Sequence, residues 1–164
     1  MKKKEIGILG LGSMGTAIAK HLKKKYKIYG YDIKKFNTLK SSKNFFFTKN
    51  LKEIFLKTNI FIVIVLDEDQ CQTIFDSFID IKKRLKIKKN YTIINCTTVS
   101  PNWVKKTYKK LQKNNFEYID CPVSGGPKKA INGKLSLMIS SKKNIYKKNL
   151  TLLRDIGSNI YNLG

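Results

Sequence analysis

The feature that most constrains the fold is a glycine-rich segment that lies between a short apolar run and an amphipathic run. Residues 5–9 are largely apolar, and Gly10-Leu11-Gly12-Ser13-Met14-Gly15 follows them directly. From residue 14 to residue 25 apolar side chains recur at helical spacing, and residues 26–31 return to the character of a strand. The first 31 residues therefore predict a strand, a tight glycine turn, a helix and a second strand.

The same alternation continues to the end of the chain. We expect further strands at residues 45–47, 60–66, 91–95, 116–120, 135–139 and 159–161, and further helices near residues 34–40, 51–57, 69–85, 102–113 and 145–155. The run 60–66 is apolar on both faces, as a central parallel strand covered by helices must be. The pattern predicts a single α/β domain over residues 1–164, a Rossmann-type doubly wound, mostly parallel sheet with right-handed crossovers.

Composition excludes disordered and membrane-spanning classes of protein. The hydrophobic share is 41% and the mean hydropathy is -0.33. The longest apolar run, residues 60–66, is far shorter than the roughly 20 residues that a helical membrane span requires. Glycines interrupt the N-terminal apolar stretch, so we expect no export signal. Cys71, Cys96 and Cys121 form no CxxC motif, which favours a reducing, cytoplasmic location.

The formal net charge of +23 raises the question of a nucleic-acid partner. Only Arg84 and Arg154 among the 34 basic residues are arginine, although phosphate recognition favours the guanidinium group. The lysine excess accompanies many Asn, Ile, Phe and Tyr residues, as a genome rich in A and T would produce. We therefore expect a solvated basic surface, weak salt-sensitive adhesion to nucleic acid and no specific nucleic-acid partner. A basic nucleic-acid-associated protein stays the alternative hypothesis.

The glycine segment matches GxGxxG between a predicted strand and a predicted helix, which is the context of a dinucleotide-binding loop. The first glycine allows the tight turn, the second lets the backbone approach a diphosphate, and the third lets the helix pack closely on the strand. The N–H groups and the positive end of the helix dipole then hold the phosphates. The candidate cofactor-binding residues of this loop are Gly10, Leu11, Gly12, Ser13, Met14 and Gly15.

An acidic residue follows the second predicted strand, where dinucleotide-binding folds place a carboxylate that binds the ribose. Asp32 lies at the end of the second predicted strand, 17 residues after Gly15, where its carboxylate can accept hydrogen bonds from ribose hydroxyls. A carboxylate there repels a 2′-phosphate, which favours NAD over NADP, although Lys34 and Lys35 lie close enough to offset the repulsion. The cofactor is therefore expected to be NAD or NADP, with a preference for NAD.

A second glycine motif follows the strand predicted at residues 116–120. Its sequence is Asp120-Cys121-Pro122-Val123-Ser124-Gly125-Gly126-Pro127, and its position places it at the carboxyl edge of the sheet, where open α/β sheets bind ligands. Successive N–H groups of the Ser-Gly-Gly turn and the Ser124 hydroxyl suit a small carboxylate. The alternative interpretation is a plain turn between a strand and a helix.

The two motifs together resemble those of the β-hydroxyacid dehydrogenase family, which includes 3-hydroxyisobutyrate dehydrogenases and is related to 6-phosphogluconate dehydrogenase. The resemblance spans essentially the whole chain. It implies that Ser124, Gly125 and Gly126 contact the substrate, that Thr98 lies near the nicotinamide, and that Leu66 and Asp67 match a leucine-proline pair that touches the cofactor. Three positions depart from the family pattern: Asn95 replaces Asp, Asp67 replaces Pro, and Ser140-Ser141 replace glycines.

The resemblance also implies an activity, namely reversible hydride transfer between NAD(P) and a small 3-hydroxy acid or semialdehyde. In the family the acid-base lysine belongs to a G-x-G-x-x-x-K-x-x-N segment that opens an all-helical catalytic and dimerisation domain. No lysine of residues 1–164 matches it, so we expect this domain to be absent, assign no catalytic residue, and expect the chain to bind dinucleotide better than it catalyses. A second polypeptide could supply the domain, and a non-catalytic dinucleotide-binding module is the alternative.

We expect neither a catalytic histidine nor a metal site. His21 is the single histidine, and its place on the first predicted helix, away from the carboxyl edge, indicates a structural role. No residue pattern indicates a metal site.

Overall fold

The computed structural model describes residues 3–34 and 42–164. The strands of this part of the chain are β1 (Glu5–Leu9), β2 (Lys27–Tyr31), β3 (Phe45–Thr48), β4 (Ile60–Val63), β5 (Tyr91–Asn95), β6 (Phe116–Asp120), β7 (Val123–Ser124), β8 (Ser136–Ile139) and β9 (Asn159–Asn162). The helices are α1 (Ser13–Leu22), α2 (Leu51–Lys57), α3 (Glu68–Arg84), α4 (Pro101–Lys113), α5 (Gly126–Ala130) and α6 (Lys143–Ile156).

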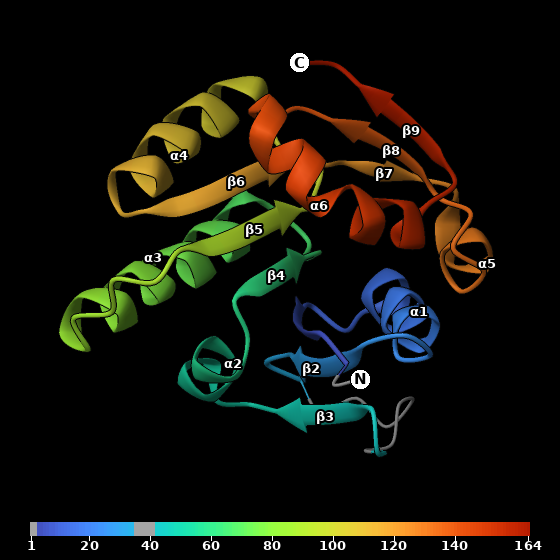
Figure 1. Cartoon of the computed structure of the whole chain (residues 1–164), viewed down its shortest axis with the longest axis horizontal. Coiled ribbons are helices and arrows are strands. Elements are labelled where there is room, and N and C mark those ends of the chain that lie inside the picture. The colour runs from blue at the N-terminus through green and yellow to red at the C-terminus, as the bar shows by residue number, and fades with distance from the viewer. Residues whose placement is uncertain (1–2, 35–41) are drawn as a thin grey trace.

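The main sheet has six parallel strands in the order β3-β2-β1-β4-β5-β6 (Figure 1). The chain winds outward from β1 to β3, returns through α2 to β4, and then winds in the opposite direction to β6. This order confirms the predicted Rossmann-type doubly wound sheet. The winding direction reverses between β1 and β4, which is the place where open α/β sheets bind ligands.

Alternate residues of the central strands enter two hydrophobic cores, one on each face of the sheet. On β4, Ile60 and Ile62 join the core formed with α1 and α6, whereas Phe61 joins the core formed with α2, α3 and α4. The second core is rich in aromatic rings, and the centroids of Phe55 and Tyr91 lie 4.3 Å apart. Burial on both faces explains why the β4 sequence is apolar at every position.

The last third of the chain builds a second sheet, which differs from the continuous sheet that the sequence predicted. After β6 the chain reaches Pro122, which has no N–H group with which to continue a ladder. The short strand β7 pairs antiparallel with β8, and β8 pairs parallel with β9. The two sheets meet where the Asp120 and Ser140 backbones exchange hydrogen bonds of 3.0 and 2.9 Å. Strand β7 and helix α5 were not predicted.

Helix α1 packs against elements of both parts of the fold, including α5 and α6. Directly after α1, the Tyr26 hydroxyl donates a hydrogen bond of 2.6 Å to Asp155 on α6, and Lys25 forms an ion pair with the same carboxylate. On α1 itself, the Nδ1 atom of His21 lies 3.1 Å from the carbonyl oxygen of Ile131, just beyond α5. These contacts give His21 the structural role that the sequence indicates.

Two predicted boundaries are wrong and one predicted helix is not described. Strand β4 ends at Val63 rather than at residue 66, because the Val65 N–H donates to the Thr97 hydroxyl, at 3.0 Å, as the chain turns toward α3. Helix α1 ends at Leu22 rather than at residue 25. The helix predicted near residues 34–40 lies almost wholly outside the described residues. Within residues 3–34 and 42–164, no helix has both the length and the apolar character of a membrane span.

Candidate functional site

The ends of four neighbouring strands form one row at the carboxyl edge of the main sheet. Leu9 of β1 is in register with Val63 of β4, Val63 with Asn95 of β5, and Asn95 with Asp120 of β6. The loops that follow these strands therefore begin side by side. The ends of β1 and β6 are separated by three strand spacings, roughly 14 Å. The first glycine turn directly follows β1 at this edge, and the segment that leads through β7 to the second glycine turn starts at the same edge, after β6.

The first glycine turn is tightly packed against the strands beside it. Gly10 has a φ of +91°, and its N–H donates to the Tyr31 carbonyl at 2.9 Å. A Cβ atom at Gly10 would collide with the carbonyl oxygen of Ile64, and one at Gly15 would collide with the carbonyl oxygen of Gly10. Only glycine fits these two positions, so the third glycine brings α1 close to β1 in the way that the motif predicts.

The middle glycine is different, because a Cβ atom at Gly12 would meet no atom within 4 Å. Gly12 is the N-cap of α1, no side chain caps the helix, and the first turn contains no acidic residue. The first N–H groups of a helix have no acceptor within the helix. At the start of α1, the N–H groups and the positive end of the helix dipole therefore lie beside open space at Gly12. Such a helix start can bind the negative charge of a diphosphate.

Asp32 supports this loop from the end of β2. Its Oδ2 atom accepts a hydrogen bond of 2.7 Å from the Leu11 N–H, and its Oδ1 atom accepts one of 2.8 Å from the Lys34 N–H. A carboxylate oxygen can accept more than one hydrogen bond. Asp32 therefore fixes the glycine loop and still has capacity for ribose hydroxyls. Lys35, which the sequence analysis also considered, lies outside the described residues.

The loops after β4 and β5 carry the residues predicted to touch the cofactor. The Leu66 side chain is 82% exposed, and Thr98 is also exposed. The Asp67 carboxylate accepts a hydrogen bond of 2.9 Å from the Gln70 N–H, so it caps α3. A helix-capping Asp gives a physical reason for the replacement of the family proline at this position.

Two contacts that no sequence pattern indicates hold these loops together. Thr97 is buried and binds Val65 across the two loops, whereas Thr98, its neighbour in the sequence, was the residue predicted to act here. The Ser100 N–H donates to the Glu68 carboxylate at 2.6 Å, and hydrogen bonds from Ser100 lower the pKa of that carboxyl. No sequence pattern distinguishes these side chains from their exposed neighbours.

The second glycine turn lies between β7 and α5. Gly125 and Gly126 have φ values of +131° and +72°, a region that side chains with a Cβ rarely adopt. Ser124 is exposed and pairs through its backbone with Ser136 of β8. Because α5 packs against α1, the structure places this turn close to the helix that begins in the first glycine loop.

Beneath the row of loops lies a small buried polar cluster. The Asn95 side chain is fully buried, donates to the Tyr118 hydroxyl at 3.2 Å, and accepts from the Thr97 N–H at 3.4 Å. Beside it, burial raises the pKa of the Asp120 carboxyl to about 6, and the Asp120 Oδ1 atom has no hydrogen-bond partner among the described residues. Asparagine at position 95 therefore avoids a second buried carboxylate next to Asp120.

The cysteines of this region do not have the character of nucleophiles. Cys71, Cys96 and Cys121 are free and buried. A hydrogen bond with Cys96 and burial raise the pKa of the Cys121 thiol, so the reactive thiolate is disfavoured. Among the described residues, no cluster of three or more His, Cys, Asp or Glu side chains could hold a metal ion.

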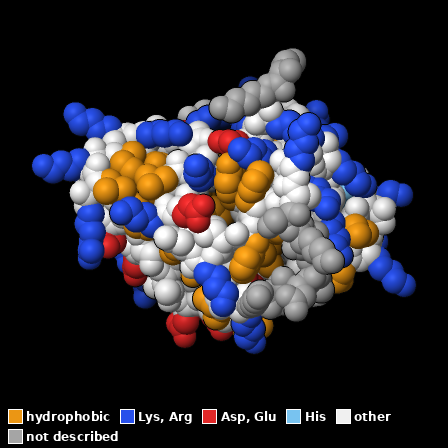
Figure 2. All heavy atoms as spheres, turned by 90° about the horizontal axis from the view of Figure 1, so that it is seen from below, with side chains coloured by type: hydrophobic (Ala, Val, Ile, Leu, Met, Phe, Trp, Pro, Cys, Tyr) orange, Lys and Arg blue, Asp and Glu red, His pale blue; other side chains and the backbone are white. Residues whose placement is uncertain are grey.

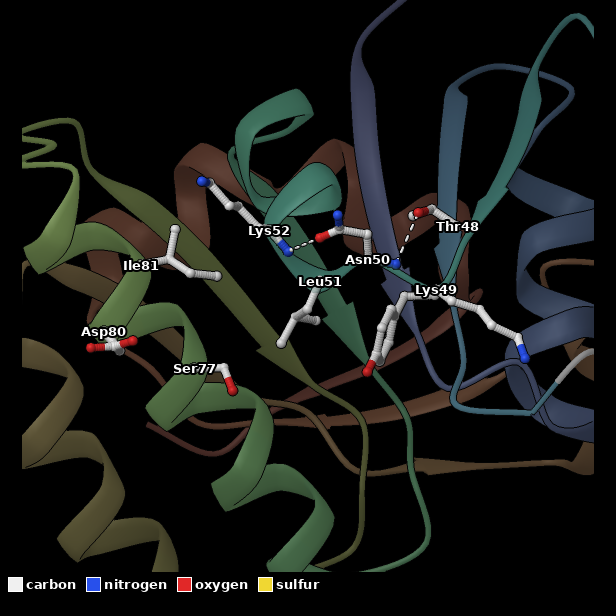
Figure 3. A pocket seen from close by; sticks show the side chains of 9 residues that line it. Thr48, Lys49, Asn50, Leu51, Lys52, Ser77, Asp80 and Ile81 are labelled. Atoms are coloured by element: carbon white, nitrogen blue, oxygen red, sulfur yellow. Dashed lines mark hydrogen bonds between the residues drawn. The ribbon is translucent and has the colours of Figure 1, made fainter.

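A cavity of about 670 Å³ opens between α2 and α3, beside the end of β2 (Figure 3). Lys49, Lys52, Ser77 and Asp80 line it, together with Tyr31, the residue before Asp32. As Figure 3 shows, Asn50 caps α2 here by accepting a hydrogen bond of 3.0 Å from the Lys52 N–H. No predicted site residue lines this cavity, so the candidate site is the open row of loops and not this hollow.

Comparison with known proteins gives relatives that match this chain almost end to end. A 2-(hydroxymethyl)glutarate dehydrogenase of Eubacterium barkeri is 26% identical over 165 residues, which cover 99% of this chain and 54% of that protein. The mitochondrial 3-hydroxyisobutyrate dehydrogenase of Drosophila melanogaster is 29% identical over 164 residues, which cover 98% of this chain and 49% of that protein. The chain thus spans about half the length of these curated relatives.

A solved structure agrees in fold. An imine reductase variant from Myxococcus stipitatus, in complex with NAD+, superposes with a TM-score of 0.86 at 17% identity, covering 100% of this chain and 55% of the other. The profile of the family described as the NAD binding domain of 6-phosphogluconate dehydrogenase matches residues 5–164. Since this profile spans nearly the whole chain, the chain belongs to that family of NAD-binding domains and takes a nicotinamide cofactor.

Proposed function

We propose that the chain is the cofactor-binding half of an oxidoreductase that transfers a hydride between a nicotinamide dinucleotide and a small 3-hydroxy acid. The loop from Gly10 to Gly15 binds the diphosphate, and the turn of Ser124, Gly125 and Gly126 binds the substrate carboxylate. The supporting observation is the single row of strand ends, at which the first turn begins and from which the chain continues through β7 to the second turn. The bound nicotinamide supplies or accepts the hydride, and the residues of this chain hold the two reactants.

The cofactor that we propose is NAD rather than NADP. The Asp32 carboxylate is fixed beside the loop by its bond to Leu11, at 2.7 Å, so it cannot easily turn away from an added phosphate. Lys34 is exposed and binds Asp32 through its backbone N–H, which leaves its ammonium group free to move in solvent. The Asp32 carboxylate is thus held in place, whereas the Lys34 ammonium is mobile. We therefore expect Asp32 to decide the preference for NAD over NADP.

The remaining predicted residues are proposed to contact the cofactor from the neighbouring loops. The exposed Leu66 offers an apolar surface to one face of the dinucleotide, and Thr98 lies on the next loop along the row, where we place the nicotinamide. Asp67 contributes through the helix cap that fixes this loop. These roles follow the family resemblance and the order of strands along the edge.

We further propose that the acid-base group comes from outside the 164 residues described by this sequence. The substrates named for the relatives are small hydroxy acids, namely 3-hydroxyisobutyrate and 2-(hydroxymethyl)glutarate, and the same class is proposed here. A positioned proton donor contributes typically about 10²- to 10⁴-fold to the rate. The purified chain should therefore bind NADH and catalyse only slowly. Three buried free cysteines support our proposal of a reducing, cytoplasmic location.

The decisive experiment is a fluorescence titration of the purified chain with NADH and with NADPH, using Gly12→Ala as the test variant. A methyl group at Gly12 touches nothing in the protein, and the poorer N-cap preference of alanine is offset by its lower unfolded-state entropy, so the thermal unfolding midpoint should change little. The same methyl group would occupy the space of the diphosphate and break its bonds to helix N–H groups. We expect NADH affinity to fall by about tenfold or more.

The matched control is Ser124→Ala, which alters the second turn alone and should leave the NADH dissociation constant within about twofold. NADPH should bind more weakly than NADH. Unchanged NADH affinity in Gly12→Ala would contradict the proposed diphosphate site. Saturable NADH binding without any turnover of 3-hydroxy acids, even when a polypeptide that carries an acid-base lysine is added, would favour the non-catalytic module instead.

A further inference from the structure

A second cavity, of about 610 Å³, lies at the opposite edge of the sheet from the glycine loops. Helices α3 and α4 follow β4 and β5 and run back across the sheet, so both helices end at the amino edge, next to the starts of β5 and β6. The cavity occupies the space where the two helices end. Five lysines line it, namely Lys82, Lys83, Lys86, Lys88 and Lys113. None of the lining residues in the described part of the chain is acidic.

The cavity has a rigid floor because one of these lysines is buried. The Lys82 side chain donates hydrogen bonds of 3.1 and 2.8 Å to the carbonyl oxygens of Asn114 and Asn115, directly after α4. Its ammonium group also lies 4.9 Å from the centre of the Phe116 ring. Lys82 is only 6% exposed, and burial lowers its pKa. This contact joins the end of α3 to the end of α4 and so holds together the two backbone segments that carry the other lysines.

The positive charge of the cavity exceeds what the two helix ends require. A helix C-terminus carries about half a negative charge, so two of them can offset roughly one ammonium group, a role that Lys82 already fills. The exposed Lys83, Lys86, Lys88 and Lys113 remain. None of them takes part in the five ion pairs found among the described residues. About four uncompensated charges therefore surround one hollow.

We propose that this cavity binds a short phosphate chain, such as the triphosphate of a nucleotide or free tripolyphosphate. Three or more adjacent negative charges match the surplus, and a lysine ammonium donates three hydrogen bonds to phosphate oxygens. The described lining contains no arginine, and the rings of Tyr91 and Phe116 behind it are buried, so bases have no exposed stacking platform. These features favour a compact polyanion over a nucleic-acid strand.

Lysines are common over much of the surface, so the proposal depends on their convergence in one hollow rather than on net charge. Figure 2 shows one face of the molecule, on which lysine and arginine side chains lie among apolar and neutral groups over much of the surface. Scattered charges attract any polyanion weakly and lose that attraction in salt. A cavity in which several lysines converge should keep a measurable affinity for polyphosphate at physiological ionic strength.

The test is calorimetric titration of sodium tripolyphosphate, and separately of ATP, into the chain in 150 mM salt with NADH at saturation. The test variant replaces Lys83, Lys86, Lys88 and Lys113 by Gln. The control variant replaces four exposed lysines outside the cavity, Lys105, Lys106, Lys142 and Lys143, by Gln, so both lose the same charge. We expect the cavity variant to bind tripolyphosphate about thirtyfold more weakly and the control variant to bind within about threefold of the original chain.

Three outcomes would overturn the proposal. Equal losses in both variants would show that binding follows net charge alone. Displacement of tripolyphosphate by NADH would place it in the glycine loop. Tighter binding of a single-stranded oligonucleotide than of tripolyphosphate, lost in the cavity variant, would identify nucleic acid as the ligand. Equal affinity for ATP and tripolyphosphate would support recognition of the phosphate chain itself. Unchanged circular dichroism and cooperative thermal unfolding in both variants establish that the folds are intact.

Discussion

At the scale of single residues, the Asp120 carboxyl gives a sharp pH prediction. Burial raises its pKa from an ordinary value near 4 to about 6, so between these values the folded chain holds a proton that the unfolded chain releases. Stability contributed by this group is therefore present at low pH and lost as the pH rises through about 6. We expect Asp120→Asn to stabilise the chain by about 1–2 kcal/mol at pH 8 and by little at pH 4.

Urea unfolding at the two pH values measures the difference. The control is Asp69→Asn, which removes an exposed carboxylate from the first turn of α3 and should not stabilise the chain at either pH. An equal effect of Asp120→Asn at pH 4 and pH 8 would show that the Asp120 carboxyl ionises at its ordinary pKa.

The polar cluster around Asp120 also marks the limit of prediction at this scale. The sequence identifies Asp120 as the first residue of a motif and Asn95 as a departure from the family pattern. It does not predict that the two lie opposite each other in adjacent strands or that Tyr118 joins them, because those contacts depend on strand register. The register of β5 and β6 brings together side chains that are about 25 positions apart in the sequence. A local sequence pattern cannot predict such a pairing.

At the scale of elements, the ends of α3 and α4 have an unusual backbone. Lys86 and Asn115 follow the two helices with φ values of 52° and 57°, in the left-handed region that glycine usually occupies at a helix C-terminus. The Ile87 N–H closes the end of α3 by donating to the Lys82 carbonyl at 3.0 Å. We expect Lys86→Gly to stabilise the chain by about 0.5–1 kcal/mol, because glycine relieves strain here at some cost in unfolded-state entropy.

Chemical denaturation checks this expectation. Asn115→Gly should gain less, since asparagine tolerates the left-handed region. Lys83→Gly, within the last turn of α3, should cost about 1 kcal/mol. A loss of stability in Lys86→Gly would mean that the lysine side chain contributes more at this helix end than its backbone costs.

The elements that the sequence predicts well are those with strong local periodicity. The strand, glycine turn and helix at the N-terminus, and the long helices α3 and α4, have clear apolar patterns, and their positions are confirmed within a few residues. The two-residue strand β7 and the five-residue helix α5 are too short to show a period. Whether β8 and β9 extend the main sheet or form their own depends on non-local pairing, which the pattern of either strand cannot indicate.

At the scale of the whole molecule, the net charge of +23 predicts a stabilising effect of salt. Self-repulsion destabilises a compact chain of high net charge, and ions screen it. Each of the five ion pairs among the described residues has a lysine or arginine side chain that is about one-third exposed or more, and such pairs contribute little. Raising NaCl from about 0.02 to 0.3 M should therefore increase the thermal midpoint by about 2–4 °C for each kcal/mol recovered.

Scanning calorimetry in NaCl measures this, and the same ionic strength reached with KCl should give the same gain if screening is the cause. A midpoint that falls with NaCl would mean that the ion pairs outweigh the self-repulsion. A larger rise of the thermal midpoint with polyphosphate than with either salt would indicate binding in the cavity between α3 and α4 instead.

The position of α1 between the main sheet and the helices α5 and α6 has a consequence for how the molecule opens. One continuous core joins Ile18 and Leu22 of α1 to Leu137 of the second sheet. Local unfolding of the C-terminal third would uncover the buried side of the helix that begins in the Gly12 loop. Any ligand that tightens this loop should therefore slow amide hydrogen exchange as far away as β8, and both sheets should exchange as a single cooperative unit.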